Sequence, residues 1–117
     1  MVKITLTGNP ISTQTAYLSQ GKRRFLSHRA RTRKQQYEWE VKNQWKGEPL
    51  EGDLSIDIVL YFGTKRRVDW DNFHKISTDS LEGIVFKDDS QIQEAHVIKD
   101  YDKENPRIEM VIHSLTD

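Results

Sequence analysis

A run of large apolar residues at every second position of residues 54–62 constrains the fold of this chain more than any other feature. The apolar members are Leu54, Ile56, Ile58, Leu60 and Phe62. Because successive side chains of a strand point to opposite faces, this pattern predicts a strand with one face in a core. Shorter alternating runs predict strands over residues 2–7 and 107–114, and residues 92–100 are expected to form another.

Helical periodicity replaces this alternation over residues 28–46. One narrow stripe, at about 100° per residue, contains Ala30, Tyr37, Val41 and Trp45, which is the spacing of a helix side that faces a core. Trp39 falls on the opposite side, where a dimer contact, DNA stacking and a ring lying flat on its own surface are all open. Residues 11–27 are polar and basic, and we expect a loop or a loose hairpin whose tip carries Lys22, Arg23 and Arg24.

A second helix is expected from about Asn72 to Leu81, with Gly83 as its end signal. The expected order is therefore strand, helix, strand, helix, strand, strand. This order predicts an α+β fold (α/β mixed), with a small mixed β-sheet of about four to five strands and two helices packed on it. At 117 residues the chain is expected to be one domain over residues 1–117.

The composition excludes several kinds of site. The chain has no cysteine, which excludes a disulfide framework, a thiolate zinc site and a cysteine nucleophile. No stretch approaches the roughly 20 apolar residues of a membrane span, and residues 1–7 read as a strand and not as a signal peptide. We therefore expect a cytoplasmic protein with no membrane partner. Apolar residues make up only 35% of the chain, so its core is thin and a partner chain is favoured.

Charge is distributed unevenly along the chain. Residues 1–50 carry 10 Lys or Arg and 3 Glu, whereas residues 51–117 carry 8 Lys or Arg and 15 Asp or Glu. A basic half could follow a phosphate backbone while an acidic half gathers divalent cations. On these counts alone, two halves of one domain that simply attract each other explain the pattern at least as well.

Six carboxylates are concentrated within residues 69–89, namely Asp69, Asp71, Asp79, Glu82, Asp88 and Asp89. Several have an ordinary local explanation. Asp71 is a good N-cap for a helix that starts at Asn72, Asp69 could close a turn, and Asp88 and Asp89 could belong to a polar turn.

The expected second helix separates apolar from charged side chains. Its apolar face contains Phe73, Ile76, Leu81 and Ile84, and its opposite face exposes Asp71, Lys75, Asp79 and Glu82. The order of Lys75 and Asp79 is the less favourable one for an ion pair four residues apart. The charged face is therefore not optimised for helix stability, which leaves room for another purpose.

We infer that this purpose is cation binding. Hard divalent ions such as Mg²⁺ prefer oxygen ligands, and a bound cation removes the repulsion among crowded carboxylates. Asp69 and Asp71 alternate around a turn so that both can lean toward one ion, and Asp89 could arrive from the segment after the helix. Such an ion would activate water and neutralise charge on a scissile phosphate, while Lys75 could stabilise the charge that develops there.

The spacing of these residues resembles a known signature. Residues 69–92 carry the run Asp69-x-Asp71-Asn72-x-x-Lys75-x-x-x-Asp79-x-Leu81, then Gly83 and Asp88-Asp89-x-Gln91-Ile92. This run is similar to that of the RusA-type Holliday junction resolvases. The resemblance implies a RusA-like fold and a homodimer that makes paired symmetric nicks in four-way DNA junctions, in recombination and repair.

The same resemblance implies the cofactor and the site. The cofactor would be Mg²⁺, with Mn²⁺ as the candidate substitute, and we expect no small-molecule cofactor. Carried over residue by residue, the catalytic set is Asp69, Asp71, Asp89 and Lys75, with the three aspartates as metal ligands. The resemblance also implies a bacterial origin, in a phage or prophage.

Basic residues next to the acidic run are expected to hold DNA. Residues 22–34 include seven Lys or Arg and no acid, and a further basic group directly precedes the acidic run. Phosphate contacts supply most nonspecific affinity for DNA. The predicted DNA-binding residues are Lys22, Arg23, Arg24, Arg29, Arg31, Arg33, Lys65, Arg66 and Arg67.

Two other functions remain open from the sequence. A sugar-nucleotide transferase also uses Asp-x-Asp with a metal, but it needs a nucleotide-binding sheet and a phosphate loop that this chain does not supply. The alternative from another class is a non-catalytic DNA-binding or phage-assembly module whose acidic cluster only caps a helix. Metal-dependent cleavage of DNA separates this module from the enzyme.

Overall fold

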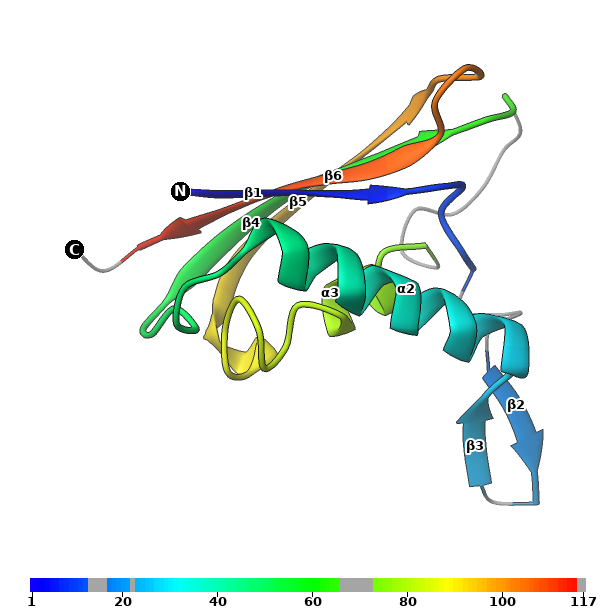
Figure 1. Cartoon of the computed structure of the whole chain (residues 1–117), viewed down its shortest axis with the longest axis horizontal. Coiled ribbons are helices and arrows are strands. Elements are labelled where there is room, and N and C mark those ends of the chain that lie inside the picture. The colour runs from blue at the N-terminus through cyan, green and yellow to red at the C-terminus, as the bar shows by residue number, and fades with distance from the viewer. Residues whose placement is uncertain (13–16, 22, 66–72, 116–117) are drawn as a thin grey trace.

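The computed structural model describes residues 1–12, 17–21, 23–65 and 73–115. Its main sheet has four strands in the order β1-β6-β4-β5, which are β1 (Val2–Thr7), β4 (Leu54–Phe62), β5 (Ile92–Tyr101) and β6 (Arg107–Ser114) (Figure 1). Strand β6 pairs antiparallel with both β1 and β4, whereas β4 and β5 run parallel. The sheet is therefore mixed, and the predicted fold class is confirmed.

The alternating apolar residues of three strands meet in one core. Across the sheet, Met110 of β6 lies in register with Ile4 of β1 and Ile58 of β4. All three side chains are buried, as the alternation predicts. Strand β5 differs because it is an edge strand with most side chains exposed, including Ile98 at 58%.

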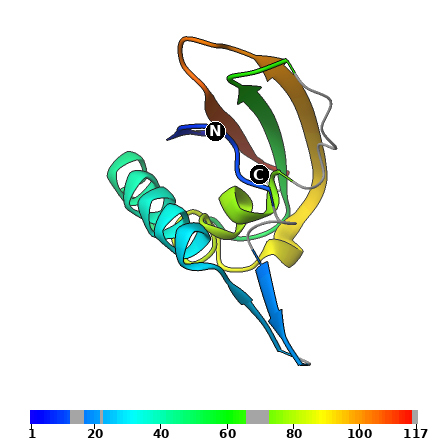
Figure 2. The same ribbon diagram turned by 90° about the vertical axis from the view of Figure 1, so that its right-hand side faces the viewer.

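Helices α2 (His28–Gln44) and α3 (Lys75–Asp79) lie on the same side of the sheet (Figures 1 and 2). Ser27 caps α2 by accepting a hydrogen bond from the N–H of Ala30 at 3.1 Å. Of the predicted stripe, Ala30, Tyr37 and Val41 are fully buried and Trp45, at the end of the helix, is partly buried, while Trp39 is 67% exposed. No helix among the described residues is long and apolar enough to cross a membrane.

Helix α3 is much shorter than the predicted range of Asn72 to Leu81. It ends at Asp79, and Asn72 lies outside the described residues. The hydroxyl groups of Ser77, Thr78 and Ser80 donate hydrogen bonds to main-chain carbonyls of the preceding turn, at 2.7 to 2.8 Å. Such bonds compete with regular helical hydrogen bonding, which explains why the chain turns here.

A separate hairpin is formed by β2 (Tyr17–Gln20) and β3 (Arg23–Leu26). It projects from the body of the molecule just before α2 begins (Figures 1 and 2). The prediction of a hairpin within residues 11–27 is confirmed. Leu26, at its base, packs against the core.

Side chains of α2 cover the outer edge of β1. The amide of Gln44 accepts a hydrogen bond from the N–H of Thr5 and donates one to its carbonyl, both at 2.7 Å, as a neighbouring strand would. One turn earlier, Glu40 accepts from the hydroxyl of Thr7 at 2.8 Å. Unpaired groups on an edge strand favour association with other chains, so α2 both covers the core and closes this edge.

The Arg33 guanidinium joins α2 to the segment that follows β1. Its Nη2 donates to the hydroxyl of Tyr37 and to the carbonyl of Asn9, both at 2.8 Å. The Tyr37 side chain is fully buried, and burial raises the pKa of its hydroxyl even though the charge of Arg33 lowers it. This pair therefore combines a charged donor with a buried acceptor, which is a strong type of hydrogen bond.

We predict that Tyr37→Phe lowers the free energy of unfolding by about 1–3 kcal/mol, because the partly buried guanidinium loses an acceptor. Urea denaturation followed by circular dichroism measures this difference. Tyr61→Phe is the control, since no hydrogen bond of the Tyr61 hydroxyl is found within the described residues, and it should change stability by less than about 0.5 kcal/mol. Equal stability of Tyr37→Phe and the wild type would contradict the role given to this pair.

Candidate active site

Three carboxylates converge where the chain turns between α3 and β5. Glu82, Asp88 and Asp89 offer oxygen atoms that all lie within 4.8 Å of one another. The carboxylate of Glu82 also accepts a hydrogen bond from the backbone N–H of Asp89 at 2.9 Å, across seven residues of chain. The turn thus brings the predicted site residue Asp89 into an acidic cluster, which we call the acidic turn cluster (Glu82, Asp88 and Asp89).

Buried residues hold this turn on the body of the protein. Leu81, Val85 and Phe86 are completely buried and belong to the core. The N–H of Gly83 donates to the carbonyl of Phe86 at 2.7 Å, and Gly83 has a φ of +80°, which an L-residue rarely adopts. The apolar side of the turn is therefore fixed, and its acidic side chains face outward.

The two adjacent aspartates have opposite pKa shifts. The pKa of Asp88 is lowered because the backbone N–H of Ser90 donates to its carboxylate, which caps the short 3₁₀-helix η2 (Asp89–Gln91). The pKa of Asp89 is raised by its hydrogen bond with the Asp88 carboxyl group and then by the negative charge of Glu82. The negative charge around Asp89 thus disfavours its ionised form, and a bound cation would offset that repulsion.

Helix α3 adds a cation next to this cluster. Lys75 forms an ion pair with Asp79, with 3.3 Å between Nζ and Oδ2. The charge of Asp79 is also among the causes of the raised pKa of Asp89. Asp79 thus pairs with Lys75 and also acts electrostatically on Asp89, while a shared site of Lys75 and Asp89 stays a prediction.

The segment that carries the other predicted acids is anchored at both ends. The ring of Phe62, at the end of β4, packs edge-on against the ring of Phe73, with 5.1 Å between centroids. The N–H of Gly63 donates to the side-chain Oδ1 of Asn9 at 2.9 Å. Between these anchors, residues 66–72 lie outside the described residues, and they include Asp69, Asp71, Arg66 and Arg67.

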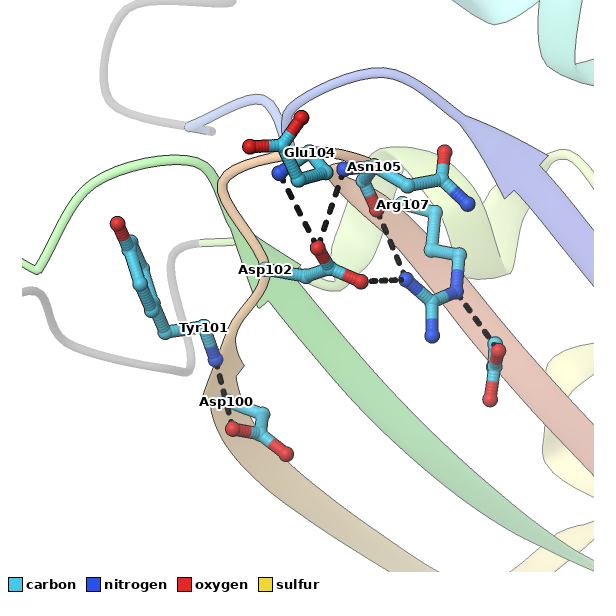
Figure 3. Close-up of polar contacts among 7 residues, drawn as sticks. Asp100, Tyr101, Asp102, Glu104, Asn105 and Arg107 are labelled. Carbon is cyan, nitrogen blue, oxygen red and sulfur yellow. Dashed lines mark hydrogen bonds and ion pairs between the residues drawn. The ribbon is translucent and has the colours of Figure 1, made fainter.

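A polar network fixes the neighbouring end of the sheet, at the β5–β6 turn (Figure 3). Asp102 accepts hydrogen bonds from the backbone N–H groups of Glu104 and Asn105, both at 3.1 Å. Arg107 donates to the carboxylates of Asp102 and Glu109, both at 2.7 Å. The N–H of Asp102 also donates to the carbonyl of Phe62 at 2.9 Å, so this network supports the point from which the acid-bearing segment leaves β4.

The predicted DNA-binding residues are spread over several elements. Arg29 and Arg31 are exposed on α2, and Nζ of Lys65 lies 5.1 Å from the ring centroid of Tyr101. Arg33 is only partly exposed and is engaged with Tyr37 and Asn9, so its role in the described structure is to hold α2. Of the remaining residues, Arg23 and Arg24 lie in β3, whereas Lys22 lies outside the described residues.

The structure does not place the basic hairpin beside the acidic turn cluster. In Figure 1 the β2–β3 hairpin projects from the end of the molecule at which α2 begins, well apart from the yellow turn that precedes β5. Contact of the hairpin with DNA therefore stays a prediction.

Sequence reasoning did not assign Glu82 to the site. Its contact with Asp89 depends on how the chain reverses after Gly83, which periodicity does not describe. A signal was present for the rest of the turn, because Asp88-x-x-Gln91 has the spacing of a capping box, and the structure contains this box. The reading of Asp88 as part of a polar turn is thus correct, while Asp89 remains available for another role.

Comparisons with known proteins agree on one family. The sequence model of the family described as Endodeoxyribonuclease RusA matches residues 7–113. A relative from Aquifex aeolicus (strain VF5), described as a crossover junction endodeoxyribonuclease RusA, is 36% identical over 66 residues. That alignment covers 56% of this chain and 52% of the relative, so the match spans about half the length of the relative.

Proposed function

Because the chain belongs to the RusA family of endodeoxyribonucleases, we propose that it is a structure-selective endonuclease that resolves four-way DNA junctions by paired symmetric nicks. The observation that carries the proposal is the convergence of Asp89 with two further carboxylates, beside the helix that carries Lys75. The proposed catalytic residues are Asp69, Asp71, Asp89 and Lys75.

The donor atoms of the site suit a hard divalent cation. Glu82, Asp88 and Asp89 present only carboxylate oxygens, which Mg²⁺ and Mn²⁺ prefer. We propose that Asp89 holds Mg²⁺ together with Asp69 and Asp71, and that Mn²⁺ can replace it. When bound, such an ion supplies Lewis acidity toward the scissile phosphate and the attacking water.

Cationic side chains of the chain would bind and stabilise the phosphates of the DNA. Lys75 is more than half exposed although it pairs with Asp79, so its ammonium group would be able to approach a phosphate that carries developing negative charge. Exposed Arg29 and Arg31 and the basic hairpin would bind phosphates of the junction arms. A bound cation would offset the negative charge of Asp88 and Glu82, which both raise the pKa of Asp89, and so would relieve the repulsion among the three carboxylates.

We predict that Asp89→Asn and Asp71→Asn each lower Mg²⁺-dependent cleavage of a synthetic four-way junction by on the order of a hundredfold or more. Binding of the same junction should stay equal or become tighter, because a negative charge that faces phosphate is removed. Denaturing gels of end-labelled strands measure cleavage, and gel shifts in Ca²⁺ or EDTA measure binding. Asp100→Asn is the matched control, since Asp100 is an exposed acid of β5 outside the acidic turn cluster.

Two outcomes of this assay would contradict parts of the proposal. A wild-type protein that binds the junction but leaves it uncut with Mg²⁺ and with Mn²⁺ would identify a non-catalytic DNA-binding module, in which Asp88 only caps η2. Equal nicking of a plain duplex and of the junction would retain the nuclease and reject junction selectivity.

We also propose that the chain acts as a homodimer, since paired symmetric cuts in a four-way junction require two sites related by a two-fold axis. The exposed side chains of Trp39 and Ile98 leave apolar surface for such a contact. Analytical ultracentrifugation should give about twice the chain mass of 13.8 kDa. A monomer at micromolar concentration, both free and on the junction, would remove the basis for coordinated cuts.

A further inference from the structure

The side chain of Gln91 uses every hydrogen-bonding position of its amide. Its Oε1 accepts from the backbone N–H groups of Lys87 and Asp88, at 2.9 and 3.0 Å. Its Nε2 donates to the carbonyls of Leu50 and Gly52, both at 3.0 Å. A glutamine amide offers two acceptor sites and two N–H donors, so all four are satisfied, and all by main-chain partners.

These four bonds join two segments that are far apart in the sequence. One is the turn that leads into Asp89, and the other is the segment at residues 50–52, just before β4. The N–H of Leu50 donates to the carbonyl of Val85 at 2.7 Å, which adds a direct main-chain link between the same two segments. Because Val85 is buried in the core, the link reaches the rigid part of the molecule.

The main-chain groups that Gln91 binds lead directly into the two aspartates of the acidic turn cluster. Lys87 and Asp88 are fixed by Gln91, and the next backbone N–H, that of Asp89, is fixed by the carboxylate of Glu82 at 2.9 Å. Three successive backbone N–H groups are therefore held by two side chains. Without Gln91, the repulsion among the carboxylates would be free to spread the turn.

We propose that Gln91 is a positioning residue that places the Asp89 carboxylate for cation binding. This inference rests on the proposed role of Asp89 as a metal ligand. Gln91 does not touch the cation or DNA in this account, and it acts only through the main chain of residues 87–89. Partners that orient metal ligands in this way typically contribute a factor of about 10 to 100 in metal affinity.

Two substitutions separate positioning from simple loss of folding. Gln91→Met keeps a similar shape and removes all four hydrogen bonds. Gln91→Asn keeps the amide without a change of charge, but it is one methylene too short to reach both segments. Gln93→Met is the matched control, because Gln93 is exposed on β5 and its side chain donates a single bond, to the carbonyl of Ser90 at 3.2 Å.

The test measures Mn²⁺ binding by isothermal titration calorimetry on the folded full chain, together with amide hydrogen exchange by NMR. We expect Gln91→Met to weaken Mn²⁺ binding about 10- to 100-fold and Gln91→Asn to weaken it less. The amides of Lys87 and Asp88 should exchange faster in both variants, and Gln93→Met should match the wild type. If Gln91→Met does not fold, Gln91→Asn decides the matter by the same measurements.

The outcomes distinguish this inference from the proposed function. A wild type that takes up Mn²⁺ and cuts the junction, with a folded Gln91 variant that binds Mn²⁺ equally well, overturns the positioning role alone. A variant that is less stable but binds Mn²⁺ with unchanged affinity shows a merely structural role and also overturns it. A wild type that takes up no Mn²⁺ overturns the metal site and the positioning role together.

Discussion

Repulsion among the carboxylates of Glu82, Asp88 and Asp89 is the constraint on which the rest of the site depends. Like charges this close destabilise a fold unless other contacts hold them or a cation neutralises them. Here the backbone N–H groups of Lys87 and Asp89 donate to the side chains of Gln91 and Glu82, and buried side chains fix the other side of the turn, namely Leu81, Val85 and Phe86. The fold therefore holds three carboxylates close together on an exposed turn, and we propose that a bound cation relieves their repulsion. Asp88 caps η2 and Glu82 accepts the backbone N–H of Asp89, whereas the side chain of Asp89 has no such main-chain role among the described residues.

The rigid parts of the molecule support this arrangement from two sides. Helix α2 covers the core and closes the edge of β1 through Gln44 and Glu40, so this end of the sheet has little freedom to pair elsewhere. At the end of β4, the ring pair of Phe62 and Phe73 and the bond between Asn9 and Gly63 bring both ends of the intervening segment to fixed points.

Much of the fold could be predicted from the sequence, because burial on one face of a strand imposes a period of two residues. The alternation in β4 and β6 predicted strand bounds and core residues together. The length of α3 could not be predicted from periodicity, since hydroxyl groups of Ser77, Thr78 and Ser80 bond to the main chain and end the helix early. The hydrogen bond of Arg33 to Tyr37 could have been predicted, because Arg33 lies four residues before the buried Tyr37 on the same side of the helix. For the site, the motif predicted Asp89 and Lys75. It did not predict the contact of Glu82 with Asp89, because that contact depends on a tertiary turn. Asp69 and Asp71 lie outside the described residues.

The proposed site requires Asp69 and Asp71 to share one cation with Asp89, which follows them by 18 residues or more. A crystal structure of the full chain grown with Mn²⁺, with anomalous scattering recorded for manganese, would locate that cation. We expect an anomalous peak within bonding distance of carboxylate oxygens of Asp89, Asp69 and Asp71. Full-occupancy manganese elsewhere on the chain, or a fully ordered structure in which Asp69 and Asp71 point away from Asp89, would contradict it.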